Sequence, residues 1–381
     1  MKWNNKGHEF DELGVKLKDI SAIYLFGAGI SGKTIYEKYQ DKINIKGFID
    51  NDSKKWNHEF CGLKVYQPEN IKLLDNEAIV ITTQPSFVND IMKLLRNMGF
   101  NANIFSCQMF FPLLDMYKFG KLCLSSISFL PTTVCNLKCK HCLNFSPYIK
   151  KHQIRTLEQL KQDLDMLFSK IDMLLILHIS GGEPFTYPYL PELIEYISEN
   201  FKEQLGRLEM TTNGTVIPSD KLLKAMKNSN VYLTVDDYRD ALPRYCEKYN
   251  DLLNRLDFYG IHYQILKADS WISLAPFETN HTNLSDEQLC KYFDACSVPW
   301  QEYRGGKLYL CNYAAYAEIA EVQKELPSND YIDLKQITEG NKIELLEFRL
   351  GYSNKGYTEF CKRCSGYHNN PYKIKAAEQI S

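Results

Sequence analysis

Apolar and polar positions alternate along this chain in a pattern that predicts strands separated by helices. Short apolar runs bounded by turn residues predict buried strands at residues 22–26, 45–49, 78–82, 124–134, 174–180, 208–212 and 231–236. Amphipathic spacing predicts helices at residues 31–39, 88–98, 156–170, 190–205, 220–227 and 243–256. Because strands that alternate with helices form parallel sheets, the pattern predicts the α/β fold class.

Length and charge restrict the class of protein. A chain of 381 residues is expected to form two or three domains. Lysine and arginine (45) nearly balance aspartate and glutamate (47), so the basic bias of a nucleic-acid binder is missing. Neither an apolar run of about 18 residues nor a secretory-type N-terminus occurs, so we expect a cytoplasmic protein without a membrane partner. Twelve cysteines in such a chain favour metal ligation over disulfides.

Three of the cysteines, Cys135, Cys139 and Cys142, occur within eight residues, directly after the strand expected at 124–134. In α/β barrels the carboxyl end of a strand carries the chemistry. Three thiolates would leave one iron of a [4Fe–4S] cluster open to a small molecule. A zinc knuckle is the alternative, but it needs four ligands, and no fourth cysteine or histidine pair completes this group. Spacing alone therefore favours a cluster and leaves zinc open.

This C-x3-C-x2-C loop resembles that of the radical S-adenosylmethionine (radical SAM) superfamily, with His141 at a position usually held by another aromatic residue. Two further motifs follow in the order seen in that superfamily, each after an expected strand. The resemblance implies a partial (β/α)6 barrel and SAM contacts from these residues: Gly181, Gly182, Glu183, Pro184, Thr212, Asn213 and Thr234. Paired glycines let the backbone approach a ligand closely, and a glutamate can receive the ammonium group of SAM.

The resemblance also implies the chemistry. In the superfamily a reduced cluster cleaves SAM, and the resulting 5′-deoxyadenosyl radical abstracts a hydrogen atom from the substrate. We therefore expect an electron donor such as flavodoxin or ferredoxin as a partner. Asp236 and Arg239 follow a barrel strand and are candidates for catalytic acid–base or orienting roles, with a solvated loop as the alternative.

A second cysteine group occupies the C-terminal part of the chain. Gly305-Gly306, between two β-prone runs, predicts a hairpin near one of these cysteines. By spacing alone, four thiolates can hold either zinc or a complete [4Fe–4S] cluster. Their order resembles the twitch domain, a shortened SPASM domain, which implies a second, auxiliary [4Fe–4S] cluster on Cys296, Cys311, Cys361 and Cys364.

The front of the chain carries Gly27-x-Gly29-x-x-Gly32 between an expected strand and helix, and Asp50 ends the next strand. This spacing matches the dinucleotide-binding fingerprint, in which the acid meets a ribose hydroxyl. The alternative is that the glycines only permit a tight turn. The segment also resembles Rossmann-like domains of sugar-modifying and surface-polysaccharide enzymes. Several of those domains bind nucleotide-sugars and some act only as docking modules, so the resemblance implies either role here.

We therefore expect a Rossmann-like domain at residues 1–115, a radical SAM core at 116–285 and a twitch/SPASM-like Fe–S domain at 286–381. The expected function is that of a radical SAM oxidoreductase-type enzyme. Its substrate would be a small carbohydrate, free or carried as a nucleotide-sugar, that undergoes oxidation or epimerisation in sugar or surface-polysaccharide metabolism. One alternative is a maturase that modifies a peptide or protein, and another is a non-enzymatic scaffold with structural metal sites.

Overall fold

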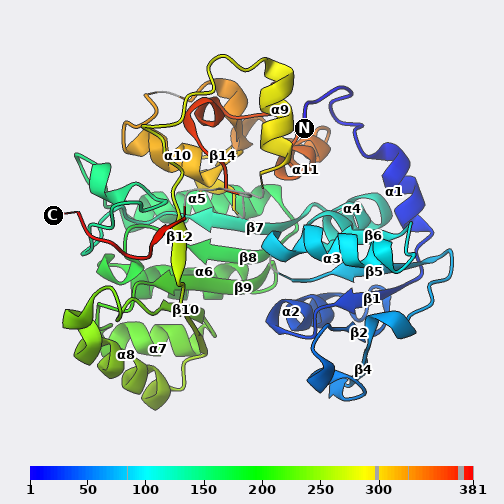
Figure 1. The fold of residues 1–381 in the computed structure, drawn as a ribbon, viewed down its shortest axis with the longest axis horizontal. Coiled ribbons are helices and arrows are strands. Elements are labelled where there is room, and N and C mark those ends of the chain that lie inside the picture. The colour runs from blue at the N-terminus through cyan, green and yellow to red at the C-terminus, as the bar shows by residue number, and fades with distance from the viewer. Residues whose placement is uncertain (84, 297–299, 325, 368–372, 381) are drawn as a thin grey trace. The chain divides into compact units, whose positions relative to one another are not determined.

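The computed structural model describes residues 1–83, 85–296, 300–324, 326–367 and 373–380, and the chain divides into two compact units (Figure 1). The first unit is Asn5–Ser125, and the second combines Met1–Asn4 with Ser126–Ser381. The first unit therefore extends beyond residue 115, because helix α4 (Cys107–Phe119) packs against α1 (Asp11–Lys18). The division expected at residues 285 and 286 does not separate compact units, because strands from both sides of it share one sheet.

The first unit is built on a six-stranded sheet in the order β3-β4-β2-β1-β5-β6. Five of its strands are parallel, and only β3 pairs antiparallel. Read from β4 to β6, this is the 3-2-1-4-5 order of an open, doubly wound sheet. The strands are β1 (Ala22–Phe26), β2 (Asn44–Ile49), β3 (Glu59–Phe60), β4 (Leu63–Tyr66), β5 (Glu77–Ile81) and β6 (Ile104–Ser106), and the remaining helices are α2 (Ile30–Tyr39) and α3 (Pro85–Asn97).

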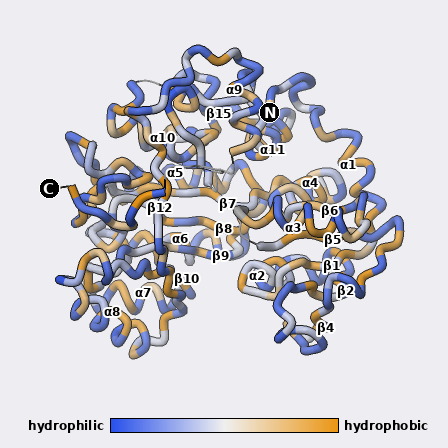
Figure 2. The backbone as a smooth tube through the Cα atoms, in the orientation of Figure 1, coloured by the Kyte–Doolittle hydropathy of each residue, from blue (hydrophilic) through white to orange (hydrophobic). Residues whose placement is uncertain are grey.

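Hydrophobic burial places these strands in the core of the first unit. Strands β1 and β5 are buried along their whole length, and Figure 2 colours most of their residues towards the hydrophobic end of the scale. Tyr39 at the end of α2 donates a hydrogen bond of 2.5 Å to the buried carboxylate of Asp115 on α4. Lys42 lies 3.7 Å from the same carboxylate, so the buried charge has a partner.

The second unit contains an eight-stranded sheet in the order β11-β10-β9-β8-β7-β13-β14-β15. Helices alternate with the strands from β7 to β11, so the α/β alternation predicted from the sequence is confirmed. The strands and helices of this part are β7 (Cys123–Phe129), α5 (Leu157–Lys170), β8 (Met173–Ile179), α6 (Leu190–Phe201), β9 (Leu205–Thr212), α7 (Asp220–Asn228), β10 (Tyr232–Asp236), α8 (Cys246–Tyr259) and β11 (Tyr263–Leu266).

The sixth parallel strand of this sheet does not follow β11. It is β13 (Glu302–Arg304), which pairs with β7 at the opposite side. Gly305 and Gly306, with φ of 60° and 78°, turn the chain into β14 (Lys307–Tyr309), and this confirms the predicted hairpin. The other C-terminal elements are α9 (Asp286–Asp294), α10 (Asn312–Ile319), β15 (Tyr331–Asp333), α11 (Lys342–Arg349) and a pair of short strands, β12 (Ser270–Ile272) and β16 (Lys373–Lys375). None of the described helices combines the length and hydropathy that a bilayer span requires.

The glycine loop before α2 offers a test of packing in the first unit. A Cβ atom on Gly32 would lie 2.1 Å from the carbonyl oxygen of Gly27, so Gly32→Ala is expected to lower the free energy of unfolding by about 1–3 kcal/mol. At Gly29 the space is open and φ is −146°, so Gly29→Ser should leave the free energy of unfolding unchanged. Urea unfolding of the full chain measures both; equal stability of the two variants would contradict this packing.

Candidate active site

The first cysteine group lies in the loop that follows β7. Cys135, Cys139 and Cys142 belong to one apolar cluster with Leu137, Leu242 and Ala377. The backbone N–H of Leu137 donates to Cys135 Sγ at 3.4 Å. Burial raises the pKa of Cys135 and of Cys139 to about 12, so a bound metal would have to stabilise the thiolate forms.

The arrangement of these thiols bears on which group they fit. Among the described residues, no three Cys, His, Asp or Glu side chains converge closely enough to hold a single metal ion. Thiolates around one zinc would lie about 4 Å apart, given Zn–S bonds of about 2.3 Å. The irons of a cubane each take one cysteine, which spreads the sulfur atoms farther. The choice of a cluster over zinc at this loop stays a prediction.

The paired glycines at the end of β8 pack against the chain segment before the cysteine loop, and their contact with SAM stays a prediction. A Cβ atom on Gly182 would lie 2.1 Å from the carbonyl oxygen of Val134, and one on Gly181 would lie 2.5 Å from that of Thr132. Gly182 N donates to Thr132 O at 3.0 Å, and Glu183 N donates to Val134 O at 2.8 Å. The glycines thus admit the chain segment that leads into Cys135, and they fix where the cysteine loop begins.

Glu183 is 1% exposed and connects two strand ends. Its carboxylate accepts hydrogen bonds from Thr212 Oγ1 at 2.8 Å, from Asn213 N at 2.8 Å and from Phe185 N at 3.1 Å. Burial is the main cause that raises its pKa to about 7. The sequence does not show this bridging role, and the contact between Glu183 and the ammonium of SAM stays a prediction. Pro184 begins the 3-10 turn that follows.

Asn213 lies between this bridge and the cysteine loop. Its Nδ2 is 3.8 Å from Cys135 Sγ and donates to Asn136 Oδ1 at 3.0 Å. Its Oδ1 accepts from Thr215 Oγ1 at 2.6 Å. Asn136, which sequence analysis missed, also donates to Thr215 at 2.7 Å, so the two asparagines and Thr215 form a closed network beside Cys135.

The candidates at the end of β10 differ in their surroundings. Thr234 and Asp236 point to the same face of β10. Thr234 accepts from Gln264 Nε2 at 3.0 Å, and Asp236 accepts from Tyr238 OH at 2.6 Å. Burial raises the pKa of Asp236 to about 6, which suits a group that exchanges protons near neutral pH.

The guanidinium of Arg239 forms an ion pair within its own loop. Its Nε and Nη2 form a bidentate pair with Asp237 at 2.9 and 2.8 Å, and its guanidinium lies 4.5 Å from the ring centre of Tyr249. A catalytic role for Arg239 would require this pair to open. The sequence shows only the charges of residues 237–240, and their pairing depends on how the loop folds back.

The second cysteine group is gathered from three separate segments: the end of α9, the start of α10 and the 3-10 turn at Glu359–Arg363. Three of the thiols lie close to a hydrogen-bonding group: Tyr367 N to Cys296 Sγ at 3.3 Å, Thr358 Oγ1 to Cys361 Sγ at 3.3 Å, and Gly366 N to Cys364 Sγ at 3.4 Å. The thiol of Cys311 has a backbone hydrogen bond from Ala314. Burial, and the proximity of the other three thiols, raise the pKa of Cys311 well above its usual range. The structure therefore brings together the four cysteines that the sequence grouped.

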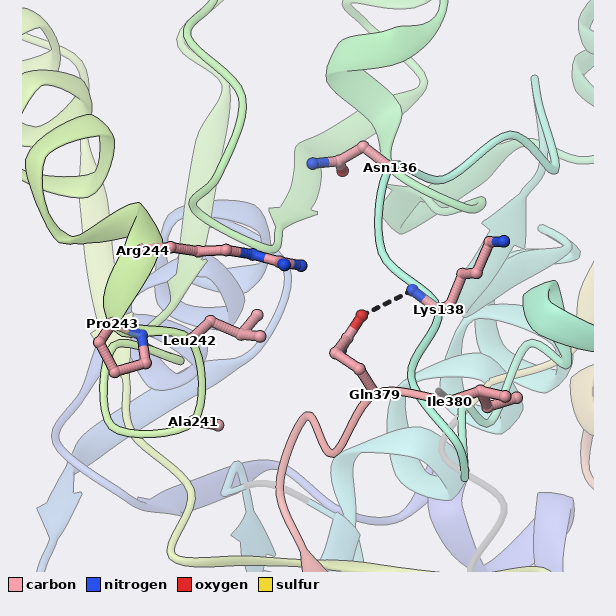
Figure 3. Close-up of a pocket in the computed structure, with 8 residues that line it drawn as sticks. All are labelled: Asn136, Lys138, Ala241, Leu242, Pro243, Arg244, Gln379 and Ile380. Carbon is pink, nitrogen blue, oxygen red and sulfur yellow. Dashed lines mark hydrogen bonds between the residues drawn. The ribbon is translucent and has the colours of Figure 1, made fainter.

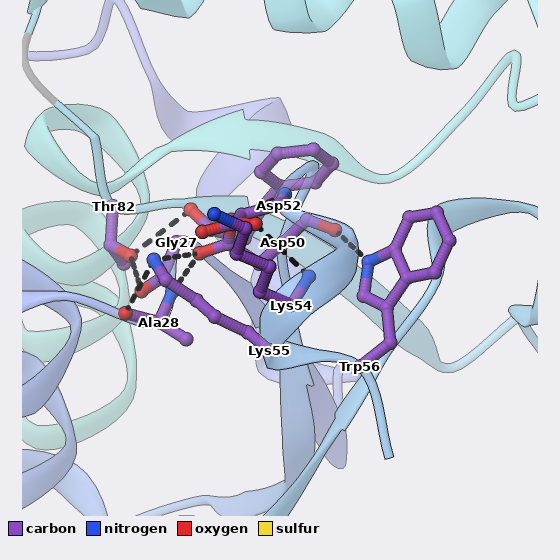
Figure 4. Close-up of polar contacts among 9 residues, drawn as sticks. Gly27, Ala28, Asp50, Asp52, Lys54, Lys55, Trp56 and Thr82 are labelled. Carbon is purple, nitrogen blue, oxygen red and sulfur yellow. Dashed lines mark hydrogen bonds and ion pairs between the residues drawn. The ribbon is translucent and has the colours of Figure 1, made fainter. Parts of the chain in front are cut away.

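The backbone of the glycine loop in the first unit is hydrogen-bonded to the side chains of Asp50 and Lys55 (Figure 4). Asp50 Oδ2 accepts from Ala28 N at 3.0 Å and from Lys55 Nζ at 2.9 Å, and Lys55 also donates to Ala28 O at 3.1 Å. The other oxygen of Asp50 accepts from Asp52 N at 2.9 Å. Both carboxylate oxygens are thus in use, so a ribose hydroxyl would have to share or displace them. Nucleotide binding by Gly27, Gly29, Gly32 and Asp50 stays a prediction.

A buried polar network lies beneath the Gly181–Gly182 turn. Tyr316 OH on α10 contacts Ser180 Oγ at 2.6 Å and donates to Glu302 Oε2 at 3.0 Å, while Ser128 Oγ donates to Ser180 Oγ at 2.8 Å. Glu302 is fully buried, and Oε1 has no hydrogen-bond partner among the described residues. Burial raises the pKa of Glu302 to about 7.

Two segments of the chain match families of known proteins. Residues 129–268 match the sequence profile of the radical SAM superfamily, and residues 20–104 match a family described as C2185-like, N-terminal. The antilisterial bacteriocin subtilosin biosynthesis protein AlbA of Bacillus subtilis is 28% identical over 152 residues, which are 36% of this chain and 32% of AlbA. The chain thus spans about a third of that curated relative.

Several solved structures resemble the fold. Native anSMEcpe with bound AdoMet has 14% identity and a TM-score of 0.44, over 67% of this chain and 93% of that one. BtrN in complex with AdoMet and 2-DOIA has 15% identity and a TM-score of 0.42, over 67% and 96%. Streptococcus suis SuiB bound to its precursor peptide SuiA has 16% identity and a TM-score of 0.31, over 55% and 48%.

The buried acid Glu302 generates a pH-dependent prediction. Its pKa in the folded chain lies above its ordinary value of 4.5, so folding favours the protonated form. The wild type should therefore lose stability as pH rises from 4.5 through 7, by up to about 3 kcal/mol, and Glu302→Gln should remove that loss. Urea unfolding at pH 5 and pH 8 measures it, with exposed Glu321→Gln as the control. If the free energies of unfolding of the wild type and Glu302→Gln differed by the same amount at both pH values, the burial of this charge would be contradicted.

Proposed function

We propose, from the premise that residues 129–268 form a radical SAM domain, that Cys135, Cys139 and Cys142 hold a [4Fe–4S] cluster whose open iron binds SAM. The observation that carries this proposal is the buried cysteine loop, with the backbone of residues 132–134 locked to the Gly181–Gly182 turn. When bound, the cluster and SAM together supply a 5′-deoxyadenosyl radical that abstracts hydrogen from the substrate. The electron comes from a one-electron donor such as flavodoxin or ferredoxin.

The chain's own residues would orient SAM and exclude water. The turn at Gly181, Gly182, Glu183 and Pro184 and the loop at Thr212 and Asn213 border the cysteine loop, and Asn213 lies beside Cys135. Asp236, whose pKa of about 6 leaves it ready to accept a proton near neutral pH, would act as an acid–base group.

The second cysteine group supports an auxiliary cluster. Cys296, Cys311, Cys361 and Cys364 meet in a buried site in which three of the sulfur atoms lie within hydrogen-bond distance of N–H or O–H groups. Such hydrogen bonds stabilise the charge on cluster thiolates. Four protein ligands would leave no open iron, so this cluster would serve as an electron acceptor and the net reaction would be an oxidation.

A peptide or protein is the substrate class that we now favour over a carbohydrate. The curated relative AlbA is named as a bacteriocin biosynthesis protein, and its similarity covers a third of each chain. The carbohydrate hypothesis depended on the Rossmann-like first unit, where binding of a nucleotide-sugar stays a prediction. Modification of a peptide, as in a radical SAM maturase, therefore replaces sugar oxidation or epimerisation as the main proposal.

Replacing the three cysteines of the loop with alanine should abolish reductive cleavage of SAM. The reason is that no other site would offer an open iron. The measurement is formation of 5′-deoxyadenosine by the reconstituted full chain under dithionite. The matched control, Cys361→Ala with Cys364→Ala, should keep this cleavage. If the loop variant still produced 5′-deoxyadenosine, the assignment of the SAM cluster would be wrong.

A substrate panel tests the peptide proposal. Binding of the correct substrate should raise 5′-deoxyadenosine formation above the uncoupled rate, because the radical then has a hydrogen atom to abstract. We expect stimulation of several-fold by members of a library of synthetic 20-residue peptides, and none by monosaccharides or nucleotide-sugars. Stimulation by a nucleotide-sugar alone would return the carbohydrate hypothesis and would also support a ligand at Asp50.

A further inference from the structure

The end of the chain lies along the first cysteine loop. Cys139 and Gln379 form an antiparallel bridge, in which Lys140 N donates to Glu378 O at 2.7 Å and Ile380 N donates to Lys138 O at 2.8 Å. Ala377 is fully buried in the same apolar cluster as Cys139. The pairing of β16 with β12 holds the preceding residues. The tail is thus a fixed part of the site, although about 240 residues separate it from Cys139 along the chain.

The side chain of Gln379 reaches the sulfur of Cys139. Its Nε2 donates to Cys139 Sγ at 3.2 Å and to Ala377 O at 2.8 Å. Its Oε1 accepts from Lys138 N at 2.8 Å, the bond drawn in Figure 3. A backbone N–H can only donate and a backbone carbonyl can only accept, so these two neighbours fix which end of the amide is oxygen. The NH2 group therefore faces the sulfur.

The same residue lines a pocket. Gln379 and Ile380 line one wall of a pocket of about 540 Å³, whose other walls include Asn136, Lys138 and Arg244. Figure 3 shows the Gln379 side chain directed at the backbone of Lys138. An apolar side chain at position 379 would remove the side-chain donor from the sulfur of Cys139.

We propose that Gln379 is a positioning residue that sets the reduction potential of the SAM-binding cluster through its hydrogen bond to Cys139. The inference rests on the proposed function, in which Cys139 ligates that cluster. A hydrogen bond to a cysteine sulfur withdraws negative charge from the cluster and stabilises the reduced form, which carries one more electron. The tail therefore makes the cluster easier to reduce by the electron donor.

The test is a redox titration of the reconstituted full chain, followed by EPR. The signal followed is the one that changes when SAM is added, which separates this cluster from the auxiliary one. Gln379→Leu removes the donor and should shift the midpoint to a more negative potential. Gln379→Glu keeps the shape and the bond from Lys138 N but places a carboxylate against the sulfur, so a larger shift in the same direction is expected.

The control is Ile380→Ala, which keeps the backbone bond to Lys138 O and touches no sulfur. It should leave the potential of the wild type unchanged. An unchanged potential in Gln379→Leu with full iron content would overturn the proposal, and so would a shift of equal size in Ile380→Ala. Loss of iron from both Gln379 variants would also overturn it, by giving the residue a structural role only. Failure of the proposed function is distinguishable, because the wild type itself would then lack a signal that responds to SAM.

Discussion

The close contact between two backbones fixes the geometry on which the rest of the site depends. Gly182 and Glu183 donate hydrogen bonds to the carbonyl oxygens of Thr132 and Val134, the last residues before Cys135. A side chain at Gly181 or Gly182 would clash with the carbonyl oxygen of Thr132 or Val134, respectively. The carboxylate of Glu183 then accepts hydrogen bonds from Thr212 and Asn213, and these bonds fix the end of β9 relative to the same turn. Three consecutive strand ends are therefore held in register around the cysteine loop.

Burial has a cost at this site that a bound cofactor would offset. Thiols whose pKa is raised to about 12 are protonated near neutral pH, so the folded chain without metal holds neutral cysteines in an apolar cluster. Binding of iron would release those protons and replace them with coordinate bonds. The hydrogen bonds from Leu137, Gln379 and the residues around the second group then stabilise the charge on sulfur. Cofactor binding would thus be coupled to folding.

The sequence predicts the local structure well where one short segment carries the whole signal. Strand β1 has the predicted bounds, and the Gly305-Gly306 turn forms the predicted hairpin. The four C-terminal cysteines meet as expected. The position of β13 beside β7 is not predictable, because strand pairing across some 170 residues leaves no local pattern. The same holds for Gln379, for the bidentate pair of Arg239 with Asp237, and for the engagement of Asp50 by Lys55. Each depends on contacts that form only when distant segments pack.

We propose that both cysteine groups hold cubanes and that only the first has an iron open to SAM. Iron and acid-labile sulfide, measured after anaerobic reconstitution of the full chain, test it most directly when combined with EPR before and after addition of SAM. We expect about eight iron atoms and eight sulfides per chain, with one of two cluster signals altered by SAM. Zinc in place of iron at the second group, or two signals that both ignore SAM, would contradict it.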